Sequence, residues 1–219
     1  MAENGQDVIQ VYWIMGRSEN SQSRVFGVER DRVFTQAADP AKVKDPSLII
    51  YNAMREIRRY FVVSNGAQTD KLIEGISAGN TFLGSLRGLE YEPDAPNFTP
   101  RITGICSLDL VGQEDPFFGF HIIRKSVCSG ESCDRFFYSY DKIERGFGFC
   151  LTTYTGDGNP LPAFVGEPLL MPLVGDIDAV ASEYWETLNE QTRVALAVKF
   201  ISLSGVSQVK VINKFTKVE

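Results

Sequence analysis

Residues 176–203 read DIDAVASEYWETLNEQTRVALAVKFISL, and they join the clearest helical pattern of the chain to a long apolar run. Five apolar residues recur at helical spacing and therefore share one helix face: Ile177, Val180, Ala181, Tyr184 and Leu188. We predict that this helix begins at Asp176, and that Val194–Leu203 and Gln208–Phe215 are the strands that close the chain. A helix with one apolar face next to strands indicates a layered architecture.

Outward from this stretch, the chain reads as strands, then helices, then strands again. The predicted strands are Val8–Met15, Val25–Val33, Leu48–Ile57, Tyr60–Ser64, Ile102–Val111, Phe117–Ser126, Arg135–Tyr140 and Phe147–Tyr154. The apolar run at Leu48–Ile57 is also compatible with a helix. One short helix is expected after a cap at Thr69 or Asp70, and a second from Thr81. Strands in two groups, with helices in separate blocks, favour an α+β fold with two sheets in one domain spanning residues 1–219.

Composition narrows the class of protein. The 219 residues are 43% hydrophobic and carry a formal net charge of -6, with a pI of about 5.0, which is typical of an ordinary soluble domain. The one dense basic run, Arg55–Arg59, is interpreted as a solvated strand end or turn, so no nucleic-acid partner is expected. No apolar stretch approaches the ~20 residues that cross a bilayer, and the polar N-terminus MAENGQDVIQ is unlike a secretory signal. We expect a cytoplasmic protein without a membrane partner, and the sequence leaves the oligomeric state open, a homo-oligomer included.

The sequence offers few ligands for a metal. Its four cysteines are Cys106, Cys128, Cys133 and Cys150, and without an export signal we expect free thiols. The single histidine, His121, lies in an apolar run and is predicted to be a packed strand residue. Because a zinc site needs three or four clustered ligands, we expect no metal and no cofactor.

Two polar segments at predicted strand ends are candidates for binding. Arg17 and Arg24 flank a serine-rich turn and could cradle a phosphate, because a guanidinium presents two parallel donors; a polar hairpin loop explains the same pattern. Tyr51 and Asn52 interrupt an apolar run and should point to opposite faces of a strand. The one that is buried needs a hydrogen-bond partner, and a satisfied core tyrosine is equally compatible.

Two further segments could bind an anion or a polar ligand. Ser64–Asp70 precedes a predicted helix, whose free N–H groups attract anions, although a plain turn with a cap fits as well. Residues 91–104 read YEPDAPNFTPRITG, and three prolines stiffen this loop, which lowers the entropy cost of holding a ligand. The loop presents four polar side chains: Asp94, Asn97, Thr99 and Arg101. A structural loop capped by its own side chains is the alternative, and Tyr154–Pro160 is a weaker fifth candidate. The patterns alone predict a metal-free site for a small anionic ligand.

Several of these segments together resemble the archaeal-type IMP cyclohydrolase family. They are Tyr12–Ser21, Tyr51-Asn52, Ser64–Gly66 with Thr69-Asp70, Tyr91–Ile102 and, as bacterial members carry it, Thr153–Pro160. The resemblance covers most of the chain. It implies a four-layered α-β-β-α sandwich similar to N-terminal nucleophile hydrolases, although the start Met1-Ala2-Glu3 offers no such nucleophile. Members usually carry a Gly-Arg stretch before the first strand, and this chain begins almost at that strand.

The implied activity is the last step of purine synthesis, in which 5-formamidoimidazole-4-carboxamide ribonucleotide closes to IMP with loss of water. Such an enzyme is a hydrolase acting on C–N bonds of cyclic amidines, and its partners are the purine nucleotide substrate and IMP. Two alternatives remain: a non-catalytic purine-nucleotide-binding relative, and an amide hydrolase on the same fold with Cys106 or Ser64 as nucleophile.

The resemblance also suggests roles for the candidate residues. Tyr51 is the predicted proton donor to the formyl oxygen, and Glu92 or Asp94 is the predicted base or ribose ligand. Arg17 is a further catalytic candidate. Together with Arg24 it would bind the phosphate or the polarised formyl oxygen of the substrate. The predicted substrate-binding residues are Arg24, Asn52, Asn65, Asp70, Asn97, Thr99 and Arg101.

Overall fold

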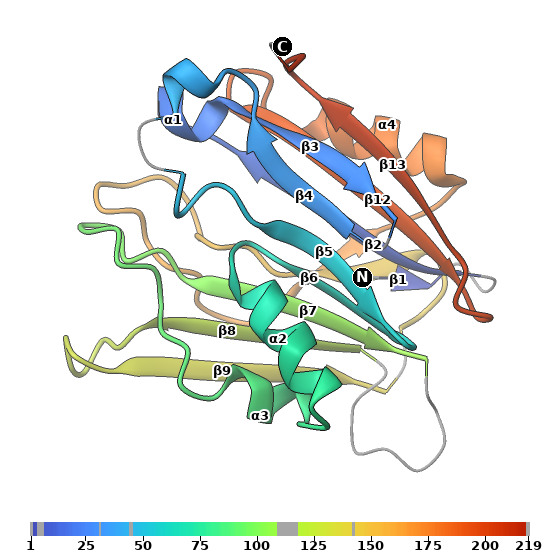
Figure 1. Ribbon diagram of the computed structural model, residues 1–219, viewed down its shortest axis with the longest axis horizontal. Coiled ribbons are helices and arrows are strands. Elements are labelled where there is room, and N and C mark those ends of the chain that lie inside the picture. The colour runs from blue at the N-terminus through green and yellow to red at the C-terminus, as the bar shows by residue number, and fades with distance from the viewer. Residues whose placement is uncertain are drawn as a thin grey trace.

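The computed structural model describes residues 2–3, 7–30, 32–43, 46–108, 118–141 and 143–217. Within these residues the strands form two sheets, and every described strand pair is antiparallel (Figure 1). The six-stranded sheet has the order β11 (Leu169–Pro172), β10 (Phe147–Cys150), β1 (Ala2–Glu3), β2 (Asp7–Met15), β12 (Arg193–Ser202) and β13 (Ser207–Asn213). The seven-stranded sheet has the order β3 (Arg24–Glu29), β4 (Arg32–Ala37), β5 (Asn52–Ile57), β6 (Tyr60–Ser64), β7 (Arg101–Ser107), β8 (Phe118–Lys125) and β9 (Cys133–Tyr140).

Helix α4 (Ile177–Thr187) covers the outer face of the six-stranded sheet. The Asp176 side chain accepts a hydrogen bond from the Ala179 N–H at 2.8 Å and caps the helix, so the predicted start is confirmed. The apolar face of α4 packs on alternate residues of the two central strands: Ile9, Leu196, Val198 and Phe200. Burial of this face explains why the helical period is so clear in the sequence.

The other face of the six-stranded sheet lies against the seven-stranded sheet. Ile14, Ala195 and Ala197 pack against Phe26 and Ala53, and further along the sheet Val8 and Ile201 pack against Phe61 and Phe118. The inward residues of β2 are 8, 10, 12 and 14, which is the alternation expected of a strand buried on both faces.

Helices α2 (Gln68–Ser77) and α3 (Phe82–Leu86) cover the outer face of the seven-stranded sheet (Figure 1). Their apolar residues Leu72, Ile76 and Phe82 pack on Val62 and Ile105. The contacts therefore run from helix to sheet to sheet to helix. A mixed fold of helices and mostly antiparallel sheets is confirmed, whereas the likeness to N-terminal nucleophile hydrolases stays a prediction.

Several predicted boundaries are wrong. Val25–Val33 is not one strand but most of a hairpin, because the chain reverses near Arg30, which has a φ of 41°. Leu48–Tyr51 forms a turn and bend, and β5 begins only at Asn52. The N-cap of α2 is Ala67, without a side-chain cap, and Thr69 and Asp70 lie inside the helix.

Other elements differ in extent. The predicted strand Phe147–Tyr154 stops at Cys150, while β1, β11, α1 (Glu19–Gln22) and the short helix η1 (Pro40–Lys42) were not predicted. The helix from Thr81 is confirmed, with the Thr81 side chain as cap. The predicted strand ends at Val111 and Phe117 lie outside the described residues.

The remaining expectations concern the histidine, the cysteines and the helices. His121 lies in β8, is 5% exposed and faces Phe82, so its prediction as a packed strand residue is confirmed. The four cysteines are free. Across the described ranges, no group of three or more His, Cys, Asp or Glu side chains is placed to hold a metal. No helix in the described part of the chain has the length and apolar character of a membrane span.

Candidate functional site

Two tyrosines from different sheets meet through their hydroxyl groups. Tyr12 points inward from β2 and Tyr51 lies just before β5, and their hydroxyl oxygens are 2.8 Å apart. The Tyr51 backbone is fixed by Thr35, whose hydroxyl accepts from the Tyr51 N–H at 2.8 Å. Burial raises the pKa of both phenols, so both are neutral and can donate a proton at pH 7.

A buried guanidinium lies beside this pair. Arg24, at the start of β3, is 7% exposed, and its Nε donates to the Ser21 carbonyl at 2.8 Å. Arg24 also lies near the Tyr51 side chain, and its charge opposes the effect of burial by lowering the pKa of Tyr51. Among the described residues no carboxylate lies within ion-pair distance of Arg24. A buried cation that has no carboxylate partner is suited to bind an anionic ligand or to stabilise a developing negative charge.

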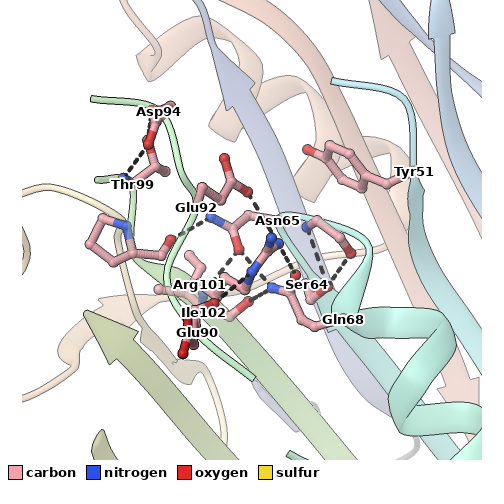
Figure 2. A network of polar contacts seen from close by, with 12 residues as sticks. Tyr51, Ser64, Asn65, Gln68, Glu90, Glu92, Asp94, Thr99, Arg101 and Ile102 are labelled. Carbon is pink, nitrogen blue, oxygen red and sulfur yellow. Dashed lines mark hydrogen bonds and ion pairs between the residues drawn. The ribbon is translucent and has the colours of Figure 1, made fainter. Parts of the chain in front are cut away.

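Glu92 brings a buried carboxyl group to the same region. It is 6% exposed, and Figure 2 shows its carboxyl group and the Tyr51 side chain extending toward the same part of the site. Burial raises the pKa of Glu92 to about 7, and Asp94 adds to the rise, while the charges of Arg101 and Arg24 oppose it. A carboxyl group with this pKa can both accept and give a proton near neutral pH.

Arg101 is held by several groups and can only partly neutralise Glu92. Its Nε donates to the Glu90 carbonyl at 2.8 Å, and its Nη1 donates to Gln68 Oε1 at 3.0 Å (Figure 2). The ion pair of Arg101 Nη1 with Glu92 Oε1 is longer, at 3.4 Å. Asn65 joins the network, because its Oδ1 accepts from the Ile102 N–H and from Gln68 Nε2, each at 2.9 Å.

The proline-rich loop is held by hydrogen bonds within the loop and by hydrogen bonds to a neighbouring segment. The Asp94 carboxylate accepts from the Thr99 N–H at 2.6 Å and from the Thr99 hydroxyl, and the Thr99 hydroxyl lies 2.6 Å from the Tyr154 hydroxyl. Asn97 Oδ1 accepts from the Leu161 N–H at 3.1 Å. Phe98 has a φ of 46°, a strained conformation for a residue other than glycine. These contacts hold residues 92–101 against the 154–161 segment.

Comparisons with known proteins identify the family of this chain. A profile of the family described as IMP cyclohydrolase-like protein matches residues 1–205, which include every residue of the site. The chain belongs to the IMP cyclohydrolase-like family. It is also 29% identical, over 119 residues, to a protein named IMP cyclohydrolase from Methanopyrus kandleri. That match covers 50% of this chain and 59% of the relative, so it spans less than two thirds of the relative's length.

Two predicted residues of this IMP cyclohydrolase-like chain lie apart from the buried group. Asn52 Nδ2 donates to both Asp70 carboxylate oxygens, at 2.9 and 3.0 Å, and Arg55 pairs with Asp70 at 3.1 Å. Asn52 points away from Tyr51, toward α2 on the outer face of the sheet. The Asn52–Asp70 contact therefore fixes the position of α2.

Arg17 lies at the exposed edge of the site. Its side chain is 46% exposed and forms a 2.6 Å ion pair with Asp157, which is 95% exposed. Its charge lowers the pKa of Tyr154, where burial acts in the opposite direction and dominates. Arg17 is thus partly exposed while Arg24 is buried, and their joint binding of a phosphate stays a prediction. The serines between them are engaged in capping α1, through Ser18 and Ser21.

The nucleophiles that an amide hydrolase would need are enclosed. Cys106 is fully buried within β7. Ser64 is 2% exposed and its hydroxyl is hydrogen-bonded to the Thr69 hydroxyl and to the Gly66 carbonyl. Neither side chain is accessible to a substrate.

Sequence reasoning missed Tyr12 and Gln68 as site residues. Tyr12 shares its strand face with Val8, Gln10 and Ile14, so strand alternation could have placed a polar hydroxyl on an inward face. Nothing in the sequence marks its pairing with Tyr51, which comes from the other sheet. Gln68 lies in a segment that was noted for its turn, but its contact with Arg101 depends on how the proline-rich loop folds.

Gly66 is expected to be essential for the Arg101 network. A Cβ at this position would lie 2.7 Å from both Arg101 Nη1 and Gln68 Oε1, and 3.1 Å from Glu92 Oε1. Gly66→Ala should therefore displace the guanidinium, reduce turnover and lower the free energy of unfolding by about 1–2 kcal/mol. Gly156→Ala is the matched control, because a Cβ there meets no atom within 4 Å. Urea unfolding and kinetics of both variants test this, and equal behaviour of the two would contradict it.

Proposed function

We propose that this chain catalyses the dehydrative closure of 5-formamidoimidazole-4-carboxamide ribonucleotide to IMP. The observation that carries the proposal is a buried carboxyl group with a pKa of about 7 next to a phenol–guanidinium group that has no carboxylate partner within the described residues. The ring closure needs a base for the attacking amide and an acid for the formyl oxygen, and this site offers both. Family membership and the relative's name support the same reaction.

In the first step, the carboxamide nitrogen attacks the formyl carbon and a C–N bond forms. The π electrons of the formyl C=O group move to oxygen, which takes the proton of Tyr51 next to the Arg24 charge. The attacking nitrogen gives one proton to the Glu92 carboxylate. Because an amide nitrogen is a poor nucleophile, orientation within one molecule is the main contribution, worth ~7–11 kcal/mol.

In the second step, the hydroxyl group leaves as water. Protonated Glu92 returns its proton to the departing oxygen while the C–O bond breaks. The former formamide nitrogen forms the C=N bond and loses its proton to the Tyr51 phenolate. Both residues thus regain their initial states, and the balance is one water lost from one substrate molecule. None of these proton transfers requires a metal or cofactor.

The remaining residues of the site would orient the nucleotide. Arg101, held by Gln68 and by the Glu90 carbonyl, is suited to the carboxamide or the ribose phosphate. Arg17, at the exposed edge, is suited to the phosphate, which would replace Asp157 as its partner. Asp94, Asn97 and Thr99 are engaged in shaping the loop, so we assign them to the wall of the site.

We further propose that residues 1–219 form one cytoplasmic domain of the N-terminal nucleophile hydrolase type, whose catalysis does not use an N-terminal nucleophile. Packing of α4 on one sheet and of α2 and α3 on the other supports the layered fold in this proposal. The enzyme would be a hydrolase acting on C–N bonds of cyclic amidines.

An absorbance assay of the purified protein with the formamidoimidazole carboxamide ribonucleotide tests the function. We expect conversion to IMP well above the spontaneous rate, and an unchanged rate after treatment with a chelator. Tight IMP binding without acceleration would instead identify a non-catalytic nucleotide-binding relative. Absence of both binding and turnover would overturn the proposal.

A further inference from the structure

We propose that Tyr12 is a positioning residue, whose hydroxyl donates to the Tyr51 oxygen and thereby directs the Tyr51 proton toward the substrate. This inference rests on the proposed function, because it assigns the direction of a proton that the ring closure uses. Tyr12 lies in β2 of the six-stranded sheet, whereas Tyr51 directly precedes β5 of the seven-stranded sheet.

The direction of the Tyr12–Tyr51 hydrogen bond is inferred from the donors that surround the Tyr51 oxygen. A phenol has one O–H donor and can accept two hydrogen bonds. The Arg24 guanidinium, which can only donate, lies near Tyr51 and lowers its pKa, so it favours a Tyr51 oxygen that faces it as an acceptor. The second contact is the Tyr12 hydroxyl at 2.8 Å, where geometry allows either oxygen to be the donor.

The Arg24 charge favours one of these two arrangements. It lowers the pKa of both phenols, and it is the largest effect opposing burial at Tyr51, whereas at Tyr12 the neighbouring phenol acts more strongly and in the opposite direction. We therefore assign Tyr12 as the donor in the 2.8 Å pair. With Tyr12 donating and the Arg24 charge nearby, the proton of Tyr51 is left for a third partner, on the side toward which Glu92 extends (Figure 2).

The same arrangement also stabilises the Tyr51 phenolate that remains after Tyr51 has given up its proton. When Tyr51 gives its proton to the formyl oxygen, a phenolate forms in a buried environment. Tyr12 and Arg24 then each donate to that phenolate, and hydrogen bonds to a charged oxygen are about twice as strong as neutral ones. Tyr12 should therefore contribute to the rate more than to substrate binding.

Tyr12→Phe tests the role because it removes only the hydroxyl and keeps the ring, whose centroid lies 5.8 Å from that of Phe26. We expect kcat to fall by about 10- to 100-fold with KM changed by less than about 3-fold. Tyr184→Phe is the matched control, since it removes a hydroxyl that donates to the Pro172 carbonyl at 2.7 Å on the far side of the six-stranded sheet. The control should keep full activity. A Tyr12→Phe variant with wild-type kcat would overturn the inference.

A second measurement separates this inference from the proposed function. Position 51 is replaced by 3,5-difluorotyrosine, which titrates at lower pH than tyrosine, and its pKa is measured by absorbance in the otherwise wild-type chain and in the Tyr12→Phe variant. Loss of the Tyr12 donor should raise that pKa by about one unit or more. If the wild-type chain does not close the ring, the proposed function fails. The titration still tests the hydrogen bond from Tyr12 to Tyr51, because it does not depend on turnover. An unchanged pKa would show that Tyr12 does not donate to Tyr51.

Discussion

Glu92→Gln is expected to slow ring closure by about 10²- to 10⁴-fold, the usual contribution of a positioned base. The amide keeps the shape of the side chain and its contact with Arg101, but it cannot take the proton of the attacking nitrogen. KM should change little, because the substitution leaves Asn65, Gln68 and Arg101 in place. Steady-state kinetics with the formamido nucleotide measure the effect. Glu186→Gln, an exposed change on α4, is the control.

The pH profile gives an independent check of this assignment. Because burial raises the pKa of Glu92 to about 7, the wild-type rate should increase with pH through that value as the carboxylate forms. The residual activity of Glu92→Gln should lack this rise. A profile that still rises near pH 7 in the variant would assign the base to another group.

The same raised pKa predicts how stability depends on pH. Between pH 4.5 and about 7 the unfolded chain loses the Glu92 proton while the folded chain retains it, so this group destabilises the fold increasingly as pH rises. Glu92→Gln does not titrate and should be more stable than wild type above pH 7, by up to about 3 kcal/mol, with little difference below pH 4.5. Urea unfolding at several pH values measures this. A stability difference that is independent of pH would contradict it.

Arg24→Met is the second substitution with a large expected effect. It should lower kcat by about 10²- to 10³-fold, because the guanidinium is the fixed positive charge next to the oxygen that gains negative charge. Arg24 is buried without a carboxylate partner among the described residues, and a methionine of similar length fills its place, so only its hydrogen bond to the Ser21 carbonyl is lost. We expect the free energy of unfolding to fall by no more than about 1 kcal/mol.

Arg101→Met should lower stability more than Arg24→Met does. This side chain donates to Glu90, Gln68 and Glu92, and its removal leaves their oxygen atoms without that donor. We expect the free energy of unfolding to fall by about 1–3 kcal/mol, together with activity. Urea unfolding of both variants with a common m-value, alongside kinetics, separates the two roles. Full activity of Arg24→Met would overturn its assignment.

The fold was predictable where local chemistry agrees with tertiary packing. The helix at Ile177–Thr187 has an apolar face and an aspartate cap, and both are local features of the sequence. The hairpin of β3 and β4 was missed because its reversal uses Arg30 with a positive φ, without the glycine or asparagine that usually marks such a turn. The cap of α2 was misplaced because Thr69 and Asp70 have cap-like side chains but bond elsewhere.

The site was predictable in part. The proline-rich loop and the separation of Tyr51 from Asn52 follow from residue type and strand alternation. Which of that pair faces inward does not follow, and the structure turns Asn52 toward Asp70 on the outer face.

By itself, the sequence determined the residue types, the stiffness of the loop and the resemblance to a family. Tertiary structure alone decided that Tyr12 reaches Tyr51, that Arg24 lies buried beside them, and that Glu92 has a pKa of about 7. The reason is physical: a phenol, a guanidinium and a carboxyl group have ordinary properties in water. The proposed roles of acid, stabilising charge and base require the packed structure, which removes the solvent between these groups.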